Sequence, residues 1–544
     1  MTRSSLSRNS LVMTLGTTAS RASGLVRTML LVACVGTVGT VANAFDIANT
    51  LPNMLFALLA AGVLQAVLMP QILKAIQADN AQERLDKLLT LSALGVLVIT
   101  ALLVACAGWI VGLYTASGAW TEQARDLTVV FSLWCIPQVF FYGLYTLLGQ
   151  VLNARGQFGA YGWAPVANNV VSIAGFGAFL MLWGRAPAEG IDDVASWSTE
   201  QTALLAGTAT LGIALQALLL FIPLRRSGFR WHFRLGLRGI GLRSAGKVVI
   251  WTLGAVVLEQ VGIAFLKNVT GAAGQAAAGV GEAAAGNFAY TNALTIYLLP
   301  HSLVVVSIIT ALFPRMSAAA AAGDLDGVRR DMSIGLRSAG IFSVFSAAVL
   351  LVLARPLTGA LVPTAGAQGI DAIAPVLQAM ALGIVALGAT VMVRRMYFAF
   401  EDGRSVFVIQ IFATASLVVA LWAATQLLPS SRWAVAAGGA YALSTWISVL
   451  LRIRGMRRKL NGIDGARVLK LYARAILAGG LAGGAGWGVV QLLGGSHVGS
   501  WPDALLVTAV AGAAMGAVYL AGLKLLRVRE LEDALAPLMR RLKR

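Results

Sequence analysis

Apolar stretches of membrane-spanning length recur along most of this chain of 544 residues, and they constrain its fold more than any other feature. A helix needs about 20 mostly apolar residues to cross the hydrocarbon core of a bilayer. Only 12% of the residues are charged, against roughly 25% in soluble domains. We therefore predict an all-α polytopic membrane protein with about 14 transmembrane helices. The predicted spans lie at 10–36, 44–75, 88–114, 127–152, 160–184, 202–224, 245–267, 285–314, 332–354, 372–398, 404–428, 433–452, 472–494 and 503–526.

Lysine and arginine are concentrated in every second loop between these spans, which indicates the orientation in the membrane. Of the 42 basic residues, only five fall in the opposite loops, namely Arg125, Arg185, Lys267, Arg355 and Arg432. The acidic loop 189–193 lies on that same side. The positive-inside rule then predicts a multi-pass protein of the bacterial cytoplasmic (inner) membrane with both termini in the cytoplasm. The net charge of +19 is read as this topology signal, and no nucleic acid partner is expected.

The two halves of the chain share short features that suggest an internal duplication. Pro70 ends the second span as Pro314 ends the eighth, and Gly156 and Gly403 follow the fourth and tenth spans at a similar offset. Parallel repeats with a substrate site between them are a known transporter plan. Chance similarity between apolar helices is the alternative. The predicted parts are an N-terminal lobe of six spans (1–224), a basic cytoplasmic linker (225–244), a C-terminal lobe of six spans (245–460), two extra spans forming a lipid groove (461–527), and a basic amphipathic cytoplasmic tail (528–544).

The tail 528–544 alternates leucines with charged residues at helical spacing. Basic amphipathic helices bind anionic membrane lipids at the inner leaflet, so this is its predicted role. Binding a protein partner is the alternative.

Two arginines lie inside the first apolar stretch. Arg21 and Arg27 precede the apolar run 29–38. A guanidinium stays protonated, and placing one at the centre of a span costs about 2.5–3.5 kcal/mol. Two in one helix indicate a polar cavity that binds an anionic substrate, and both face one cavity if the helix bends near Gly16 or Gly24. The alternative is that each forms a structural ion pair, for instance with Asp46.

Further polar residues inside the spans are candidates for the same cavity. In the second span Asp46, Asn49 and Asn53 share one helical face, and Asn43 precedes them. These residues either line the cavity or hydrogen-bond between helices. The other candidates are Tyr290, Asn292 and His301 in the eighth span, and Arg394 and Arg395 near the inner end of the tenth span.

Glu259 is the one carboxylate deep in the seventh span. An intramembrane carboxylate is a candidate for proton or cation coupling. A protonated structural role, or pairing with Lys267, is the alternative. No other cofactor is expected, and the driving force is a coupling cation or proton, or the membrane potential.

Other classes of function find little support in the sequence. The three cysteines fall in apolar runs and the three histidines lack metal-ligand spacing, so neither a disulfide framework nor a metal site is expected. The sequence contains no P-loop and no pairing of a nucleophile with a base. We therefore predict a transporter and not an enzyme.

Several short motifs recur in an order typical of one known family. They are Ser20-Arg21-x-x-Gly24-x-x-Arg27, Asn43-Ala44-Phe45, Leu51-Pro52-Asn53-Met54-Leu55, Leu299-Pro300-His301-Ser302-Leu303, Thr310-Ala311-Leu312-Phe313-Pro314-Arg315-Met316-Ser317 and Tyr397-Phe398-Ala399-Phe400-Glu401-Asp402-Gly403-Arg404. These motifs resemble the MurJ (MviN) lipid II flippases, and the glycine- and alanine-rich basic composition resembles actinobacterial members. The resemblance covers the first twelve spans. In this chain Phe56 and Ala57 stand where many members have basic residues.

The resemblance implies two six-helix lobes around a cationic cavity, with two extra helices that form a lipid-facing groove. It implies that Arg21 and Arg27 engage the pyrophosphate of lipid II, and that the chain flips this peptidoglycan precursor between leaflets for cell wall biogenesis and cell shape. The expected partners are lipid II or a related polyprenyl-pyrophosphate glycolipid, and peptidoglycan polymerases. The alternatives are a flippase for another polyprenyl-linked glycan and a drug or cation antiporter of the same superfamily.

Overall fold

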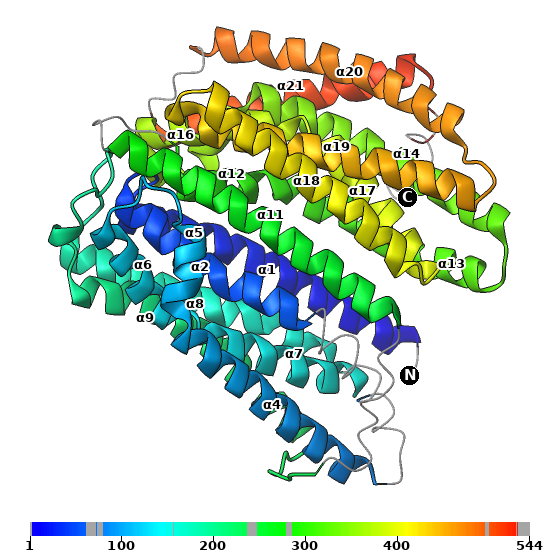
Figure 1. Ribbon diagram of the computed structural model, residues 1–544. Helices are drawn as coiled ribbons and strands as arrows, with labels where there is room; N and C mark the ends of the chain where they lie inside the picture. The colour runs from blue at the N-terminus through cyan, green and yellow to red at the C-terminus, as the bar shows by residue number, and fades with distance from the viewer. Residues whose placement is uncertain are drawn as a thin grey trace. The chain divides into compact units, whose positions relative to one another are not determined.

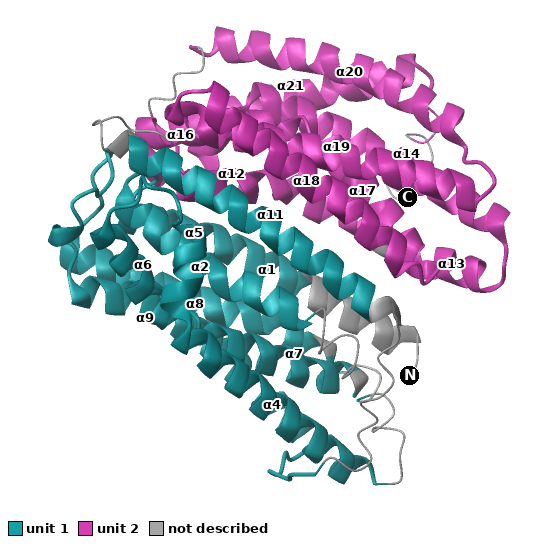
Figure 2. Cartoon of the chain, in the orientation of Figure 1, with its two compact units in different colours: residues 1–283 teal, residues 284–544 magenta. Residues whose placement is uncertain are grey.

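The computed structural model describes residues 3–60, 72, 80–155, 157–236, 247–278, 285–494, 500–528 and 530. These residues are almost entirely helical and contain no strand, which confirms the predicted all-α class. The chain forms two compact units, residues 1–283 and 284–544 (Figure 2). Compactness does not test an internal duplication, so the predicted lobes and linker stay predictions. The tail 528–544 and the features at Pro70 and Gly156 lie outside the described residues, except for residues 528 and 530.

Unit 1 is a bundle of long helices joined by short connections (Figure 1). Its elements are α1 (Arg3–Val35), α2 (Thr40–Leu59), α4 (Ala81–Ala105), α5 (Ala107–Tyr114), α6 (Glu122–Cys135), α7 (Gln138–Ala154), α8 (Phe158–Trp183), the 3-10 turn η2 (Val194–Ser196), α9 (Thr199–Leu218), α10 (Phe221–Arg226) and α11 (Lys247–Ala278). Within it, α1 packs along α8, α8 along α9, and α2 along α6, while α11 contacts α2 and α5.

Local sequence explains where several of these helices begin. The Thr121 hydroxyl accepts a hydrogen bond from the Ala124 amide and so caps α6. Ser198 and Gln201 form a reciprocal capping box at the start of α9. Such caps satisfy amide groups that would otherwise lack partners at a helix start.

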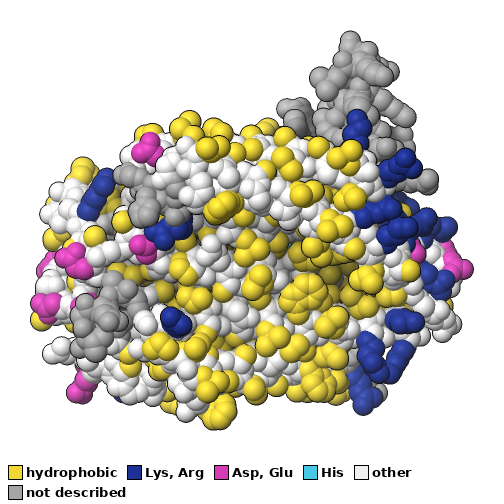
Figure 3. Space-filling view, turned by 90° about the horizontal axis from the view of Figure 1, so that it is seen from above, with side chains coloured by type: hydrophobic (Ala, Val, Ile, Leu, Met, Phe, Trp, Pro, Cys, Tyr) yellow, Lys and Arg dark blue, Asp and Glu magenta, His cyan; other side chains and the backbone are white. Residues whose placement is uncertain are grey.

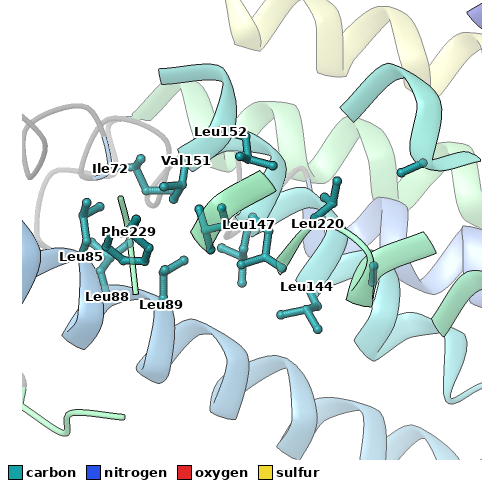
Figure 4. Close-up of a cluster of buried hydrophobic side chains, with 14 residues drawn as sticks. Ile72, Leu85, Leu88, Leu89, Leu144, Leu147, Val151, Leu152, Leu220 and Phe229 are labelled. Atoms are coloured by element: carbon teal, nitrogen blue, oxygen red, sulfur yellow. The ribbon is translucent and has the colours of Figure 1, made fainter. Parts of the chain in front are cut away.

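A cluster of buried apolar side chains, most of them leucines, joins α4 and α7 to the segment around α10 (Figure 4). Leu88 and Leu89 of α4 pack with Leu147 and Leu148 of α7, and Phe229 closes the cluster. The guanidinium of Arg155 lies 5.2 Å from the centre of the Phe229 ring. The cluster fixes α7, the helix that carries a residue of the candidate site described below.

Unit 2 contains the remaining helices. They are α12 (Asn287–Pro300), the π-helix η4 (His301–Val305), α13 (Val306–Ala321), α14 (Leu325–Val352), α15 (Ala354–Leu361), the 3-10 turn η5 (Pro363–Ala365), α16 (Gly366–Ala381), α17 (Ile384–Ala399), α18 (Gly403–Leu427), the 3-10 turn η6 (Ser430–Arg432), α19 (Trp433–Lys459), α20 (Gly465–Leu492) and α21 (Trp501–Leu525).

The last two helices are attached to unit 2 through α14. Two tyrosine hydroxyls donate hydrogen bonds to backbone carbonyls of α14: Tyr472 of α20 to Leu336 at 3.1 Å, and Tyr519 of α21 to Ile341 at 2.7 Å. Gly340 allows the close approach, since a Cβ there would lie 2.6 Å from the Tyr472 ring. The thirteenth and fourteenth predicted spans are therefore packed against unit 2.

Eleven described helices or helix pairs are long and apolar enough to cross a membrane, and a bent pair at 354–381 would make twelve. They match eleven of the predicted spans. The first predicted span falls on α1, whose arginines lower its hydropathy, and part of the second, 61–71, lies outside the described residues. The tenth is divided at Gly383 into α16 and α17. The total of fourteen stays a prediction.

Candidate functional site

Helix α1 carries both arginines of the predicted site, and it packs closely against α8. The helix runs without interruption from Arg3 to Val35. Gly16 allows close contact, because a Cβ there would lie 2.9 Å from the carbonyl oxygen of Gly162 in α8. Gly16 thus permits close helix packing, as small residues commonly do in membranes, and the bend expected near Gly16 or Gly24 stays a prediction.

An asparagine of α8 fixes the position of α1 next to Arg21. The Asn169 amide nitrogen donates hydrogen bonds to the Ser20 carbonyl at 2.8 Å and to the Ser23 hydroxyl at 2.9 Å. Arg21 and Arg27 are both half-buried. The two side chains therefore project from a helix whose position is set in part by hydrogen bonds from α8.

Arg27 lies close to side chains of two neighbouring helices. It lies near Tyr142 of α7 and Cys135 of α6, and Tyr142 in turn lies near the Asn53 side chain of α2. Within the described residues, none of the ion pairs includes Arg27. Since a guanidinium cannot lose its proton, this site carries a fixed positive charge.

The chemistry of this group suits an anion. A guanidinium offers five N–H donors in a planar fork, and the phenol of Tyr142 adds one hydroxyl. Charge-assisted hydrogen bonds to phosphate or carboxylate oxygens are about twice as strong as neutral ones. We refer to Arg27, Tyr142 and Asn53 as the arginine site.

The polar residues of α2 form a gradient from buried to exposed. Asn43 is fully buried, Asp46 is 3% exposed, Asn49 is half-buried and Asn53 is exposed. The Asn43 end therefore lies inside the helix bundle. Only the Asn49 and Asn53 end has the accessibility that contact with a ligand requires.

Asp46 forms a buried ion pair with Lys267 of α11. The Lys267 Nζ lies 2.5 Å from the Asp46 Oδ2, and the two side chains are only 6% and 4% exposed. The sequence left three roles open for Asp46: lining the cavity, hydrogen bonding between helices, or pairing with an arginine of the first span. Its ion pair is with a lysine of a different helix, which joins α2 to α11.

The start of α2 is tied to the same helix and to the acidic loop. Thr40 donates to the Asp192 carboxylate from its backbone amide at 2.8 Å and from its hydroxyl at 3.1 Å, and its hydroxyl also contacts Gln275 of α11 at 3.3 Å. Gly190 in this loop has a φ of +87°, a conformation that favours glycine. Thr40 and Asp46 of α2 thus both bind residues of α11, and of these two only Asp46 belongs to the predicted site.

Two expectations about α11 need correction. Lys267 was assigned to an external loop after a span ending at 267, but α11 continues to Ala278 and places Lys267 inside the helix. The pairing of Lys267 with Glu259 is also wrong, because Lys267 pairs with Asp46. Glu259 itself is exposed on α11.

The remaining predicted site residues lie in unit 2. Tyr290, Asn292 and His301 are buried. His301 begins the π-helix that follows Pro300, and the Asn292 amide donates to a carbonyl of its own helix at 2.9 Å. Arg394 and Arg395 are half-buried, and the Arg395 guanidinium lies 5.1 Å from the centre of a phenylalanine ring of α13.

The structure therefore brings Arg27 and Asn53 together through Tyr142, which the sequence analysis did not assign to the site. It also pairs Asp46 with Lys267, which the sequence analysis placed in a loop. Lys267 had a usable signal, since it is a lone basic residue next to a glycine- and alanine-rich run that continues the helix. Tyr142 had none, because tyrosine is common in membrane helices and its neighbours come from distant parts of the chain.

Solved structures of other proteins share the fold of this chain. The chain is similar to the lipid II flippase MurJ in an inward closed conformation, with a TM-score of 0.66 and 16% identity, over 94% of this chain and 99% of that one. It is also similar to an inward-facing multidrug resistance transporter of the MATE family, with a TM-score of 0.62 and 14% identity, over 81% of this chain and 94% of that one. The chain therefore has the same helical fold as these two proteins.

Comparison with known sequences assigns the chain to a family. The family described as Lipid II flippase MurJ matches residues 32–501. A probable lipid II flippase MurJ of Rhizobium meliloti (strain 1021) is 27% identical over 449 residues, which are 80% of this chain and 77% of the relative. A probable lipid II flippase MurJ of Rickettsia prowazekii (strain Madrid E) is 23% identical over 420 residues, 75% of this chain and 76% of the relative. The chain belongs to the MurJ family of lipid II flippases.

Proposed function

We propose that this chain moves lipid II, the undecaprenyl-pyrophosphate-linked peptidoglycan precursor, from the inner to the outer leaflet of the bacterial cytoplasmic membrane by alternating access. The observation that carries the proposal, beside the family, is the arginine site. Arg27 is a fixed positive charge in a membrane helix, and within the described residues it has no ion-pair partner. Charged groups at such positions commonly mark substrate pathways.

The charges of the two arginines suit a diphosphate better than a single phosphate. Arg21 and Arg27 are six residues apart, so their Cα atoms lie about 9 Å apart along the helix axis. A diphosphate linked to a sugar offers acceptor oxygens over a comparable length. Arg27 with Tyr142 would bind one end of this group, and Arg21 would bind the other end or the sugar.

The membrane potential supplies a driving force for such a substrate. A diphosphate that links lipid and sugar carries two negative charges, and moving each charge outward across 100 mV releases about 2.3 kcal/mol when the inside is negative. Coupling to a cation or proton through Glu259 would add to this. The exposure of Glu259 on α11 supports such a role, because a coupling group must exchange its ion with water.

The lipid tail would stay in the bilayer beside α20 and α21 while the headgroup crosses. Large apolar side chains are exposed on both helices, including Leu477, Leu481 and Trp487 of α20 and Leu505 and Leu506 of α21. An exposed apolar surface of this kind suits an isoprenoid chain. The polymerases that use lipid II outside the cell are the proposed protein partners.

The orientation has a direct test. With both termini cytoplasmic, the acidic loop containing Asp193 is external and the segment containing Arg234 is cytoplasmic. Both side chains are exposed, so cysteines placed there are accessible to a reagent. A membrane-impermeant thiol reagent added to intact cells should label position 193 and not 234. The reverse labelling would overturn the proposed orientation.

The function is tested by reconstituting the full chain into vesicles with labelled lipid II and measuring how much becomes accessible from the other side. Losing a hydrogen bond to a charged group costs about 1.5–3 kcal/mol, so Arg27→Ala should slow transport roughly ten- to hundred-fold. Arg27→Lys should retain part of the rate, because it keeps the charge and loses the planar fork. Arg404→Ala, which removes an exposed arginine of α18, is the matched control and should transport normally.

Two results would count against the proposal. Normal lipid II transport by folded Arg27→Ala would remove the role of the arginine site. Transport by the wild type of another polyprenyl-linked glycan, without transport of lipid II, would keep the mechanism and change the substrate.

A further inference from the structure

A pocket of about 700 Å³ lies where α19 ends and α20 begins. One part of its wall is apolar and includes Leu450 and Ile453 of α19, and another part carries Arg454 and Arg457 of the same helix. The first residues of α20, beginning at Gly465, complete the lining. All of these residues belong to unit 2, so the pocket is defined within that unit.

The pocket lies at the ends of two candidate membrane spans. Both α19 and α20 are long and apolar enough to span a membrane, as Ser430–Lys459 and Gly465–Leu492, and only five residues join these two segments. A connection this short keeps the two helix ends at the same depth. Figure 3 shows lysine and arginine side chains gathered at one end of the visible face, beside a broad apolar surface.

The charge of the pocket is positive and locally uncompensated. Arg454 and Arg457 are three residues apart, so they lie on the same face of α19. Both are exposed, and none of the ion pairs among the described residues includes either of them. The neighbouring carboxylate, Asp464, accepts a hydrogen bond from Ser333 at 2.7 Å and lies 3.7 Å from Arg467.

The start of α20 adds hydrogen-bond donors to the same pocket. Asp464 is the N-cap residue of α20, but its side chain makes no capping hydrogen bond to the helix. The amide groups of the first turn therefore lack the usual cap, and Gly465 and Ala466 line the pocket. Uncapped amides of this kind favour an anion, in addition to the two guanidinium groups.

We propose that this pocket binds the phosphate of an anionic glycerophospholipid. The phosphate would contact Arg454 and Arg457, and the acyl chains would lie against Leu450 and Ile453 on the side that faces the bilayer. Basic pockets between membrane helices at a membrane surface recognise lipid headgroups in this way. The proposal concerns a resident lipid that holds the α19–α20 junction, and it does not depend on which substrate the protein transports.

Native mass spectrometry of the full chain in detergent, titrated with phosphatidylglycerol, tests the proposal. The attraction of a basic residue to an anionic membrane surface is worth about 1 kcal/mol, so Arg454→Gln/Arg457→Gln should weaken the tightest phosphatidylglycerol site about thirty-fold. Arg458→Gln is the matched control: the residue is equally exposed on the same helix but does not line the pocket, so it should bind as the wild type does. Phosphatidylcholine should bind all three proteins alike.

Three results would overturn the proposal. One is equal phosphatidylglycerol affinity of the wild type and the double variant, both with normal melting temperatures. Another is an equal loss in Arg458→Gln, which would indicate a diffuse charge effect. The third is arginine-dependent binding of inorganic phosphate or of undecaprenyl phosphate without arginine-dependent binding of phosphatidylglycerol, which would assign the pocket to a different phosphate.

Discussion

The buried ion pair between Asp46 and Lys267 makes the sharpest stability prediction. Both side chains are almost completely buried, and the charged atoms are 2.5 Å apart. We expect Asp46→Leu and Lys267→Met each to destabilise the protein strongly, because each leaves one charge in the interior without its partner. The double variant, which removes both charges and keeps similar side-chain volumes, should be close to the wild type.

The magnitude follows from the distance and the burial. At 2.5 Å and an effective dielectric constant of about 20, the attraction is about 7 kcal/mol, and it is opposed by several kcal/mol of desolvation for each ion. The pair as a whole is therefore close to neutral for stability. Breaking a buried pair by removing one partner costs about 3–5 kcal/mol, whereas replacing both by apolar residues is often neutral or stabilising.

The assay is a double-mutant cycle on the detergent-purified chain, read as melting temperatures and as denaturation midpoints. Asp402 and Lys459 form the control pair, with the same 2.5 Å distance but side chains that are 21% and 34% exposed. Lys459→Met should lower the free energy of unfolding by less than about 1 kcal/mol, because an exposed ion pair contributes no more than that. If the costs of Asp46→Leu and Lys267→Met were simply additive, the reasoning from burial would be refuted.

Three further predictions concern other parts of the chain. Gly190→Ala should reduce the yield of folded protein, because Gly190 has a positive φ and a Cβ there would meet a backbone carbonyl between α1 and α2, whereas Gly177→Ala, at an open helical position, should be tolerated. Partial burial alone would raise the pKa of Asp402, but hydrogen bonds from Lys459 and from the first turn of α18 outweigh it, so the pKa lies below its ordinary value. Asp402→Asn should therefore be less stable than the wild type at neutral pH. The difference should disappear as the pH falls through that lowered pKa, and melting temperatures of the wild type and the variant over a range of pH would measure it. Glu259→Gln should change the pH or sodium dependence of lipid II transport in vesicles while the folded yield stays the same, and an unchanged dependence would remove Glu259 from coupling.

The positions of the membrane helices could be predicted from the sequence because hydrocarbon imposes one simple requirement, a long apolar run with its backbone hydrogen-bonded internally. The boundaries were less accurate where that signal was interrupted. Lys267 was taken as the end of a span, whereas the glycine- and alanine-rich residues after it continue α11 to Ala278. A single lysine does not end a helix when another helix supplies a carboxylate.

The chemistry of the candidate site was predictable only in part. The arginines of α1 were evident because charge is rare inside an apolar run. Their neighbours were not, since the contacts of Arg27 with Tyr142 and of Lys267 with Asp46 join segments that are more than a hundred residues apart. Sequence spacing within one helix carries no information about which face of a distant helix lies opposite.

The positive charge available at Arg27 depends on which residue pairs with the buried carboxylate of Asp46. If Asp46 paired with an arginine of α1, that arginine would be neutralised and would bind an anion poorly. Lys267 holds Asp46 instead, so Arg27 keeps its positive charge. Phe56 packs with Tyr142 at 5.6 Å between ring centres, and so supports the residue that lies beside Arg27. The chain thus keeps a positive charge at Arg27, because the buried carboxylate of Asp46 already has a partner in Lys267.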